Sequence, residues 1–253
     1  MTVPFAALPF RRLRFALLLP LALVGCDQSG TKSADSDSAP LAKVAPPAGK
    51  AWTDVIAVSA EGGYVMGNPQ APIRLVEYVS LTCSHCADFA AQSSAELKGT
   101  YVDSGRVSYE MRNFIRDAID LTAVQLTRCG PPETYFAQTD KVLANQKDFF
   151  DKAQTAGKAA QDAAFAAEPA KRGPAIGALT GLTAFFAANG LAQDRANQCL
   201  ADTAKAEALV ALINKQSDAF EIAGTPTFLV NGKKVEGNTW AAIKPLLEKA
   251  GAR

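Results

Sequence analysis

The most informative segment of the chain is residues 73–86, Ile-Arg-Leu-Val-Glu-Tyr-Val-Ser-Leu-Thr-Cys-Ser-His-Cys. Its first half, Ile73–Val79, alternates along its length and predicts a β-strand. Glu77 falls on the same face of this strand as aliphatic residues, an unusual position for a carboxylate. The second half predicts a helix that begins at a Cys-X-X-Cys pair, Cys83 and Cys86.

This pair has the spacing of a redox-active dithiol. Two cysteines three positions apart at the start of a helix can close a small disulfide ring, and the helix terminus stabilises the thiolate that forms when the ring opens. His85, the only histidine of the chain, lies inside the pair and can supply a positive charge or a hydrogen-bond donor. We expect Cys83, with an exposed sulfur, to be the nucleophile, and Cys86, one turn inward, to be the resolving thiol.

Three other interpretations of the pair compete with redox chemistry. A structural disulfide over so short a loop gains little chain entropy. A zinc site needs about four ligands, so Cys129 and Cys199 would have to converge on this helix. Chance spacing is the third. Redox chemistry is the favoured hypothesis, and no metal or cofactor is expected.

The chain begins with the pattern of an export signal. Three arginines between residues 11 and 14 precede an uncharged apolar run over 15–24, too short for a confident membrane span. The run ends in Leu23-Val24-Gly25-Cys26, which resembles a bacterial lipobox and predicts a signal peptide over 1–25 and lipidation of Cys26. The alternative is an ordinary export signal with a chance cysteine. Either places the mature protein outside the cytosol, where disulfides persist.

Composition bears on the partners. Removal of residues 1–25 takes three arginines and no acidic residue, which leaves 23 basic and 25 acidic residues and changes the net charge from +1 to −2. A nearly neutral protein argues against nucleic acid or anionic lipid as the partner. Residues 26–50 contain no aromatic residue and are rich in Ser, Asp, Pro, Ala and Gly, so they predict a disordered tether, with the folded part beginning near Ala51.

The remaining ~200 residues suit one domain, or one domain with a large insertion. The region from about 117 to 220 is rich in Ala, Gln, Lys and Asp and predicts helices. Asn231-Gly232 is a strong hairpin turn. Strands are expected over 55–58, 63–66, 73–79, 107–112, 227–230 and 233–235, and a last helix over 240–249, whose interior does not suit Pro245.

A family resemblance appears at two places. Residues 77–86, a helical insertion and the later Gly224-Thr225-Pro226-Thr227-Phe228 together resemble the DsbA family of extracytoplasmic thiol–disulfide oxidoreductases. The resemblance extends over about 67–251. It implies an α/β protein with a thioredoxin fold interrupted by a helical insertion, divided into a first part over 51–116, the insertion over 117–220 and a second part over 221–253.

The resemblance implies roles for further residues. Glu77 matches a buried acid that relays a proton to or from Cys86; the alternative is an acid that reaches solvent or pairs with a lysine. Thr225 and Pro226 match a cis-proline site that faces the redox pair and binds substrate peptide; the alternative is a trans proline at the start of a strand.

Cys129 and Cys199 lie at opposite ends of the predicted insertion. We expect a structural disulfide between them, because an exported chain rarely leaves two thiols idle. Two buried free thiols are the alternative.

The expected function is that of a monomeric oxidase, held at the membrane by a lipid on Cys26, that passes the Cys83–Cys86 disulfide to exported proteins in the periplasm or at an extracytoplasmic face. A membrane redox partner would restore the disulfide. Ser84 stands where the best-known oxidases have proline, which leaves the direction of electron flow open. The alternatives are a reductase or isomerase, a peptide-binding chaperone, and a metal-binding lipoprotein.

Overall fold

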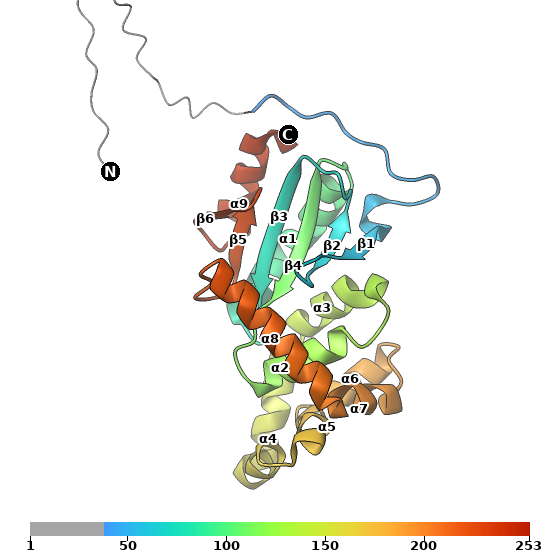
Figure 1. Cartoon of the computed structure of the whole chain (residues 1–253), viewed down its shortest axis with the longest axis vertical. Coiled ribbons are helices and arrows are strands. Elements are labelled where there is room, and N and C mark those ends of the chain that lie inside the picture. Colours follow the sequence, from blue (N-terminus) through green and yellow to red (C-terminus); the bar gives the residue numbers. More distant parts are fainter. Residues whose placement is uncertain (1–37) are drawn as a thin grey trace, which may run out of the picture. The chain divides into compact units, whose positions relative to one another are not determined.

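The computed structural model describes residues 38–253, so the predicted signal peptide and the lipidation site at Cys26 lie outside the described residues. The described chain forms a six-stranded sheet in the order β1-β2-β4-β3-β5-β6 (Figure 1). The strands are β1 (Ile56–Val58), β2 (Tyr64–Gly67), β3 (Ile73–Val79), β4 (Val107–Asn113), β5 (Thr227–Val230) and β6 (Lys233–Val235).

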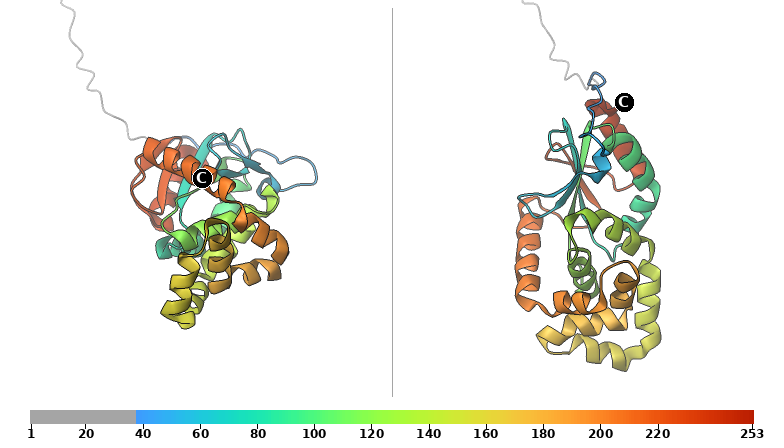
Figure 2. Two further views of the ribbon diagram at one scale, coloured as in Figure 1. Left: turned by 60° about the horizontal axis from the view of Figure 1, so that its bottom comes forward. Right: turned by 90° about the vertical axis from the view of Figure 1, so that its right-hand side faces the viewer.

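The centre of the sheet is the pair β3 and β4, which run parallel, whereas every other neighbouring pair is antiparallel. A parallel pair needs a crossover connection, and α1 (Ser84–Glu96) supplies it. Figure 2 shows the sheet edge-on, with α1 against one face and α8 (Thr203–Ala219) on the other side. Phe89 of α1 packs on Phe228 of β5 with 4.5 Å between ring centroids. The core therefore fixes the helix that carries the cysteine pair.

The chain between β4 and β5 forms the helical insertion that the sequence predicts. Its longest helix, Gln146–Phe165, bends at Gly157, where φ is 81°. Together with the six-stranded sheet, the insertion gives the α/β architecture that the sequence predicts. Its α-helices are α2 (Ala118–Thr127), α3 (Tyr135–Ala144), α4 (Gln146–Phe165), α5 (Pro169–Leu179), α6 (Leu182–Ala188), α7 (Gln193–Ala201) and α8, with a 3-10 turn at Pro132–Thr134.

The segment before β1 differs from the prediction. Residues 38–50, expected to belong to the disordered tether, run in extended form along the end of the sheet where β3 begins (Figure 1). Backbone N–H groups of Ser38, Leu41 and Val44 donate to carbonyls of the folded chain at 2.9 Å each. Gly105 leaves room for the Val44 carbonyl, which a Cβ would meet at 2.6 Å. We call residues 38–50 the strap. Ordered chain therefore includes these residues and does not start only at Ala51, because the backbone of the strap forms hydrogen bonds that composition does not reveal.

The last helix is α9 (Trp240–Leu247), followed by a π-helical turn at Glu248–Ala252. Pro245 lies inside α9, contrary to the expectation that it does not suit the interior. Burial of Trp240, Ile243 and Leu247 holds this helix in place despite the missing N–H. None of the helices within residues 38–253 combines the length and the apolar character needed to cross a bilayer.

Candidate active site

The cysteine pair lies where β3 ends and α1 begins. Cys83 is the N-cap of α1, with extended backbone angles, and Cys86 lies in the first turn. Both cysteines carry free thiols, so this is the reduced form. His85 is exposed, and within residues 38–253 its imidazole forms no hydrogen bond. The strand and helix therefore place two thiols at a helix terminus, as the sequence predicts.

The sulfur of Cys83 is less open than expected. The residue is only 5% exposed, whereas the sequence analysis expects an exposed sulfur. Its sulfur lies 3.2 Å from the backbone carbonyl oxygen of Thr225. The loop before β5, which is distant in sequence, covers this sulfur, and that contact could not be foreseen from the Cys-X-X-Cys pattern.

The pKa values of the two thiols are shifted in opposite directions. The pKa of Cys83 is lowered to about 4, chiefly by a hydrogen bond from the Cys86 thiol and also by backbone N–H groups of His85 and Cys86, while partial burial acts against this shift. Burial raises the pKa of Cys86 well above its usual range, and the neighbouring Cys83 and Glu77 raise it further. At neutral pH the reduced pair therefore carries one thiolate, on Cys83.

Glu77 lies on β3 beneath the pair and is 1% exposed. Burial raises its pKa to about 8, although the hydroxyl of Tyr109 on β4 donates to its carboxylate and opposes the shift. The charge of Lys98 lowers the pKa of Glu77, but the ammonium group of Lys98 forms its ion pair with Asp140. Glu77 therefore holds a proton at neutral pH, on the strand that leads to the cysteine pair.

The Thr225–Pro226 peptide bond is cis. Pro226 is buried, and its loop lines a cavity of about 480 Å³ together with Gly224, Thr227 and Glu236. The carbonyl of Thr225 faces Cys83, as noted above. The two site residues predicted from the family resemblance and the cysteine pair thus come together in space.

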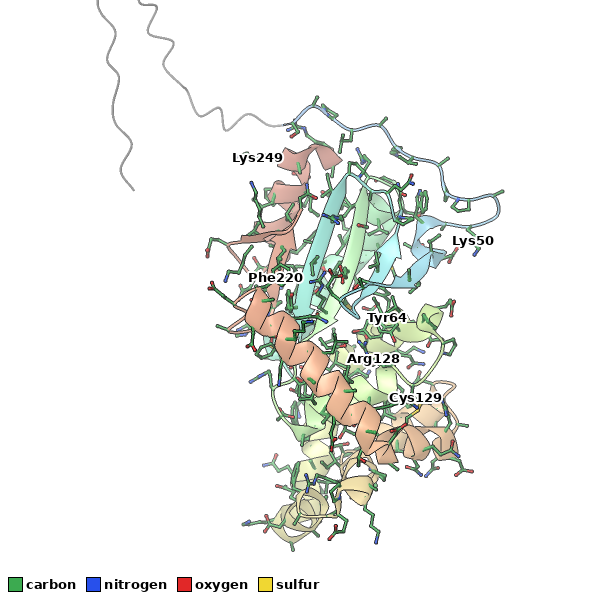
Figure 3. The ribbon with its side chains drawn as sticks, in the orientation of Figure 1. Lys50, Tyr64, Arg128, Cys129, Phe220 and Lys249 are labelled. Atoms are coloured by element: carbon green, nitrogen blue, oxygen red, sulfur yellow. A yellow bond between two sulfur atoms is a disulfide. The ribbon has the colours of Figure 1, made fainter. Side chains whose placement is uncertain are left out.

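Cys129 and Cys199 form a disulfide with 6.0 Å between their Cα atoms. It joins the end of α2 to α7, so these cysteines do not converge on the redox helix as a zinc site would require. Both line a separate cavity of about 410 Å³. Figure 3 shows Tyr64, Arg128 and Cys129 beside α8; the Arg128 guanidinium lies over the Tyr64 ring at 4.9 Å.

A family model described as thioredoxin matches residues 59–249. The chain belongs to the thioredoxin family. Among solved structures of similar fold, a protein-disulfide isomerase from Novosphingobium aromaticivorans is 32% identical, with a TM-score of 0.70 over 75% of this chain and 97% of that one. The alpha-DsbA1 protein of Wolbachia pipientis is 24% identical, with a TM-score of 0.60 over 77% of this chain and 93% of that one. The DsbA-like form of the thioredoxin fold is confirmed.

Curated relatives of this thioredoxin-family chain come from Rickettsia. A protein of Rickettsia bellii, provisionally named a protein-disulfide oxidoreductase, is 30% identical over 190 residues, which make up 75% of this chain and 65% of the relative. A second, from Rickettsia felis, carries the same name, is 29% identical and is covered over 59% of its length. The chain thus spans about 60% of the length of these relatives.

Three residues that the sequence analysis missed belong to this thioredoxin-family site. Tyr109 contacts Glu77 from the neighbouring strand, and Asp120 and Gln146 of the insertion contact the loop before Cys83. The register of β3 against β4 places Tyr109 opposite Leu75, which no single-strand pattern reveals. Asp120 follows Asp117, which caps α2, so the sequence could have marked a helix start there; it holds no signal for Gln146.

Proposed function

We propose that this protein is an extracytoplasmic thiol–disulfide oxidoreductase and acts as an oxidase. The observation that carries the proposal is the position of Cys83 at the N-terminus of α1 with Cys86 in the first turn, where the Cys86 thiol and the first backbone N–H groups lower the pKa of Cys83 to about 4. A stable thiolate makes Cys83 a good leaving group and stabilises the reduced form. A pair whose reduced form is stabilised donates its disulfide readily.

The reaction has two steps. A substrate thiolate attacks the Cys83 sulfur of the Cys83–Cys86 disulfide, forms a substrate–Cys83 disulfide and releases the Cys86 sulfur, which takes a proton from Glu77. A second substrate thiolate then attacks the substrate sulfur of this mixed disulfide and expels the Cys83 thiolate. Of the two protons that the substrate thiols release, one restores Glu77 and the other goes to solvent. The substrate loses two electrons as it gains a disulfide, and the enzyme is left as the reduced pair seen in the structure.

The other roles follow from position. Thr225 and Pro226, with the cavity beside them, would receive the substrate peptide, and the exposed His85 would favour the approach of a thiolate. We propose that exported proteins are the substrates, that a membrane protein reoxidises the pair and that the enzyme works as a monomer. The export signal and the Leu23-Val24-Gly25-Cys26 pattern support a periplasmic or other extracytoplasmic place, with a lipid anchor on Cys26.

The test is the redox equilibrium of Cys83 and Cys86 with glutathione, measured on protein that begins after Cys26. The oxidase function requires a potential well above the glutathione poise of about −220 to −260 mV. A potential near that of thioredoxin, about −270 mV, would instead mean a reductase or isomerase. The isomerase alternative has one observation in its favour, the name of the Novosphingobium structure.

A further inference from the structure

Two buried polar side chains of the helical insertion reach into the loop that joins β3 to α1. Residues 80–83, here called the redox loop, carry Cys83 at their end. Asp120 on α2 is 0% exposed and Gln146, the first residue of α4, is 8% exposed. Burying such groups is costly unless they are hydrogen-bonded. Both side chains form hydrogen bonds to the redox loop.

Asp120 holds the beginning of the loop with both carboxylate oxygens. Oδ2 accepts from the Ser80 hydroxyl at 2.6 Å and from the backbone N–H of Arg116 at 3.1 Å, and Oδ1 accepts from the backbone N–H of Leu81 at 2.9 Å. The Ser80 oxygen in turn accepts from the N–H of Thr82 at 3.3 Å. The carboxylate thereby pairs N–H groups that would otherwise be buried without acceptors as the chain leaves β3.

Gln146 holds the end of the loop. Its Nε2 donates to the carbonyl of Leu81 at 2.9 Å and to that of Cys83 at 3.0 Å. The Cys83 carbonyl also accepts the first backbone bonds of α1, from Cys86 at 3.1 Å and Ala87 at 3.2 Å. Gln146 therefore fixes the same peptide plane that orients Cys83 as the N-cap of the helix.

We propose that Asp120 and Gln146 are positioning residues that hold the redox loop so that the Cys83 sulfur faces the first N–H groups of α1. Through them, the insertion sets the redox equilibrium of a pair that it does not itself contain. Neither side chain touches the sulfur. The inference rests on the redox chemistry proposed above, but on neither direction of electron flow.

The experiment compares Gln146→Leu with Gln125→Leu in the otherwise unchanged protein. Gln125 is a matched control because it is also a buried glutamine of the insertion, and its Nε2 donates to the carbonyl of Cys199, away from the redox loop. Two readouts are taken from each variant: the pH titration of the Cys83 thiolate and the equilibrium constant with glutathione.

Gln146→Leu is expected to raise the titration midpoint of Cys83 and to shift the glutathione equilibrium three- to ten-fold toward the protein disulfide, as expected for the loss of about one hydrogen bond's worth of stabilisation. Gln125→Leu should leave both values unchanged. Unchanged values in Gln146→Leu, or an equal shift in the control, would mean that Gln146 only supports the fold and would overturn the proposal.

Asp120→Asn provides a second, nearly isosteric test if Gln146→Leu does not fold. The amide loses one acceptor and also the negative charge of Asp120, and the loss of that charge alone would lower the titration midpoint of Cys83. A raised midpoint and a shift toward the protein disulfide therefore support the proposal, and a lowered or unchanged midpoint in folded Asp120→Asn contradicts it for that residue. Since both readouts are differences between variants, they stand even if the potential of the unsubstituted protein rules out an oxidase.

Discussion

The acidity of Cys83 depends on a few donors that surround one sulfur atom. The Cys86 thiol is the largest of them. We therefore predict that Cys86→Ala raises the pKa of Cys83 from about 4 toward its ordinary value, because a methyl group cannot donate. The far-ultraviolet absorbance of the thiolate, followed against pH, measures this. A titration that stays near pH 4 in Cys86→Ala would show that the helix N–H groups alone stabilise the thiolate.

Glu77 gives a prediction with a definite sign. Its pKa is about 8 in the folded protein and 4.5 in the reference state, so between these values the folded chain binds one proton more than the unfolded chain. Folding stability therefore falls as the pH rises from 4.5 to 8. Glu77→Gln removes this loss and still accepts from Tyr109. Its stability relative to the unsubstituted protein, measured by urea unfolding, should rise through this pH range; a constant difference would mean an unshifted carboxylate.

The same substitution should slow thiol–disulfide exchange, since Gln cannot deliver a proton to Cys86. The expected loss is about 10- to 100-fold near neutral pH, at the low end of what general acids contribute. Stopped-flow exchange with a model peptide thiol checks this. Equal rates at every pH would remove the relay role and leave Glu77 as a buried acid without a catalytic task.

Among single residues, the sequence alone identifies those whose type and spacing indicate their chemistry. Cys83 and Cys86 stand three positions apart, and Glu77 is conspicuous among aliphatic neighbours. Asp120 stands in the first turn of a helix, where an acidic residue is common, and Gln146 stands in a polar stretch, so nothing local marks either as a site residue. Their significance depends on which loop the insertion packs against, and that is decided by the tertiary fold.

Among the elements, the strap makes the clearest prediction. Its three backbone bonds and the bond from the Trp52 indole to the Val44 carbonyl, at 2.7 Å, tie it to the sheet. Protein beginning at Ala51 should be less stable than protein beginning at Ser38 by about 2 kcal/mol, given roughly 0.5–1.5 kcal/mol for each net hydrogen bond. Denaturant unfolding measures the difference. The redox equilibrium should not change, and no loss of stability would mean that the strap is only loosely held.

The strands were predictable because short apolar runs are bounded closely by turn residues; the expected strand over 73–79 is β3 itself. The alternation expected for it is not seen in its burial, since Val76 and Tyr78 are buried as well as Leu75 and Val79. The helices of the insertion were harder, since an alanine-rich sequence offers little contrast between buried and exposed faces. Pro245 shows the limit of a local rule, because packing of Trp240 and Leu247 outweighs the missing hydrogen bond.

For the molecule as a whole, the Cys129–Cys199 disulfide closes a loop across most of the insertion, with a sequence separation of 70. The chain-entropy model assigns such a loop about 4 kcal/mol of stabilisation. The double substitution Cys129→Ala, Cys199→Ala should lower the free energy of unfolding by about this amount, measured with Cys83 and Cys86 kept reduced. A loss below about 1 kcal/mol would show that helix packing alone holds the insertion together.

The strap also gives the described chain a direction. Ser38 lies at the end of the sheet where β3 begins: its N–H donates to the Lys249 carbonyl and its carbonyl accepts from Arg253. Cys83 follows the other end of β3, a strand of seven residues and thus about 23 Å long. The described chain thus begins at one end of the sheet, and the thiols of Cys83 and Cys86 lie near the other end. A partner that contacts the strap would therefore lie at the opposite end of β3 from the dithiol.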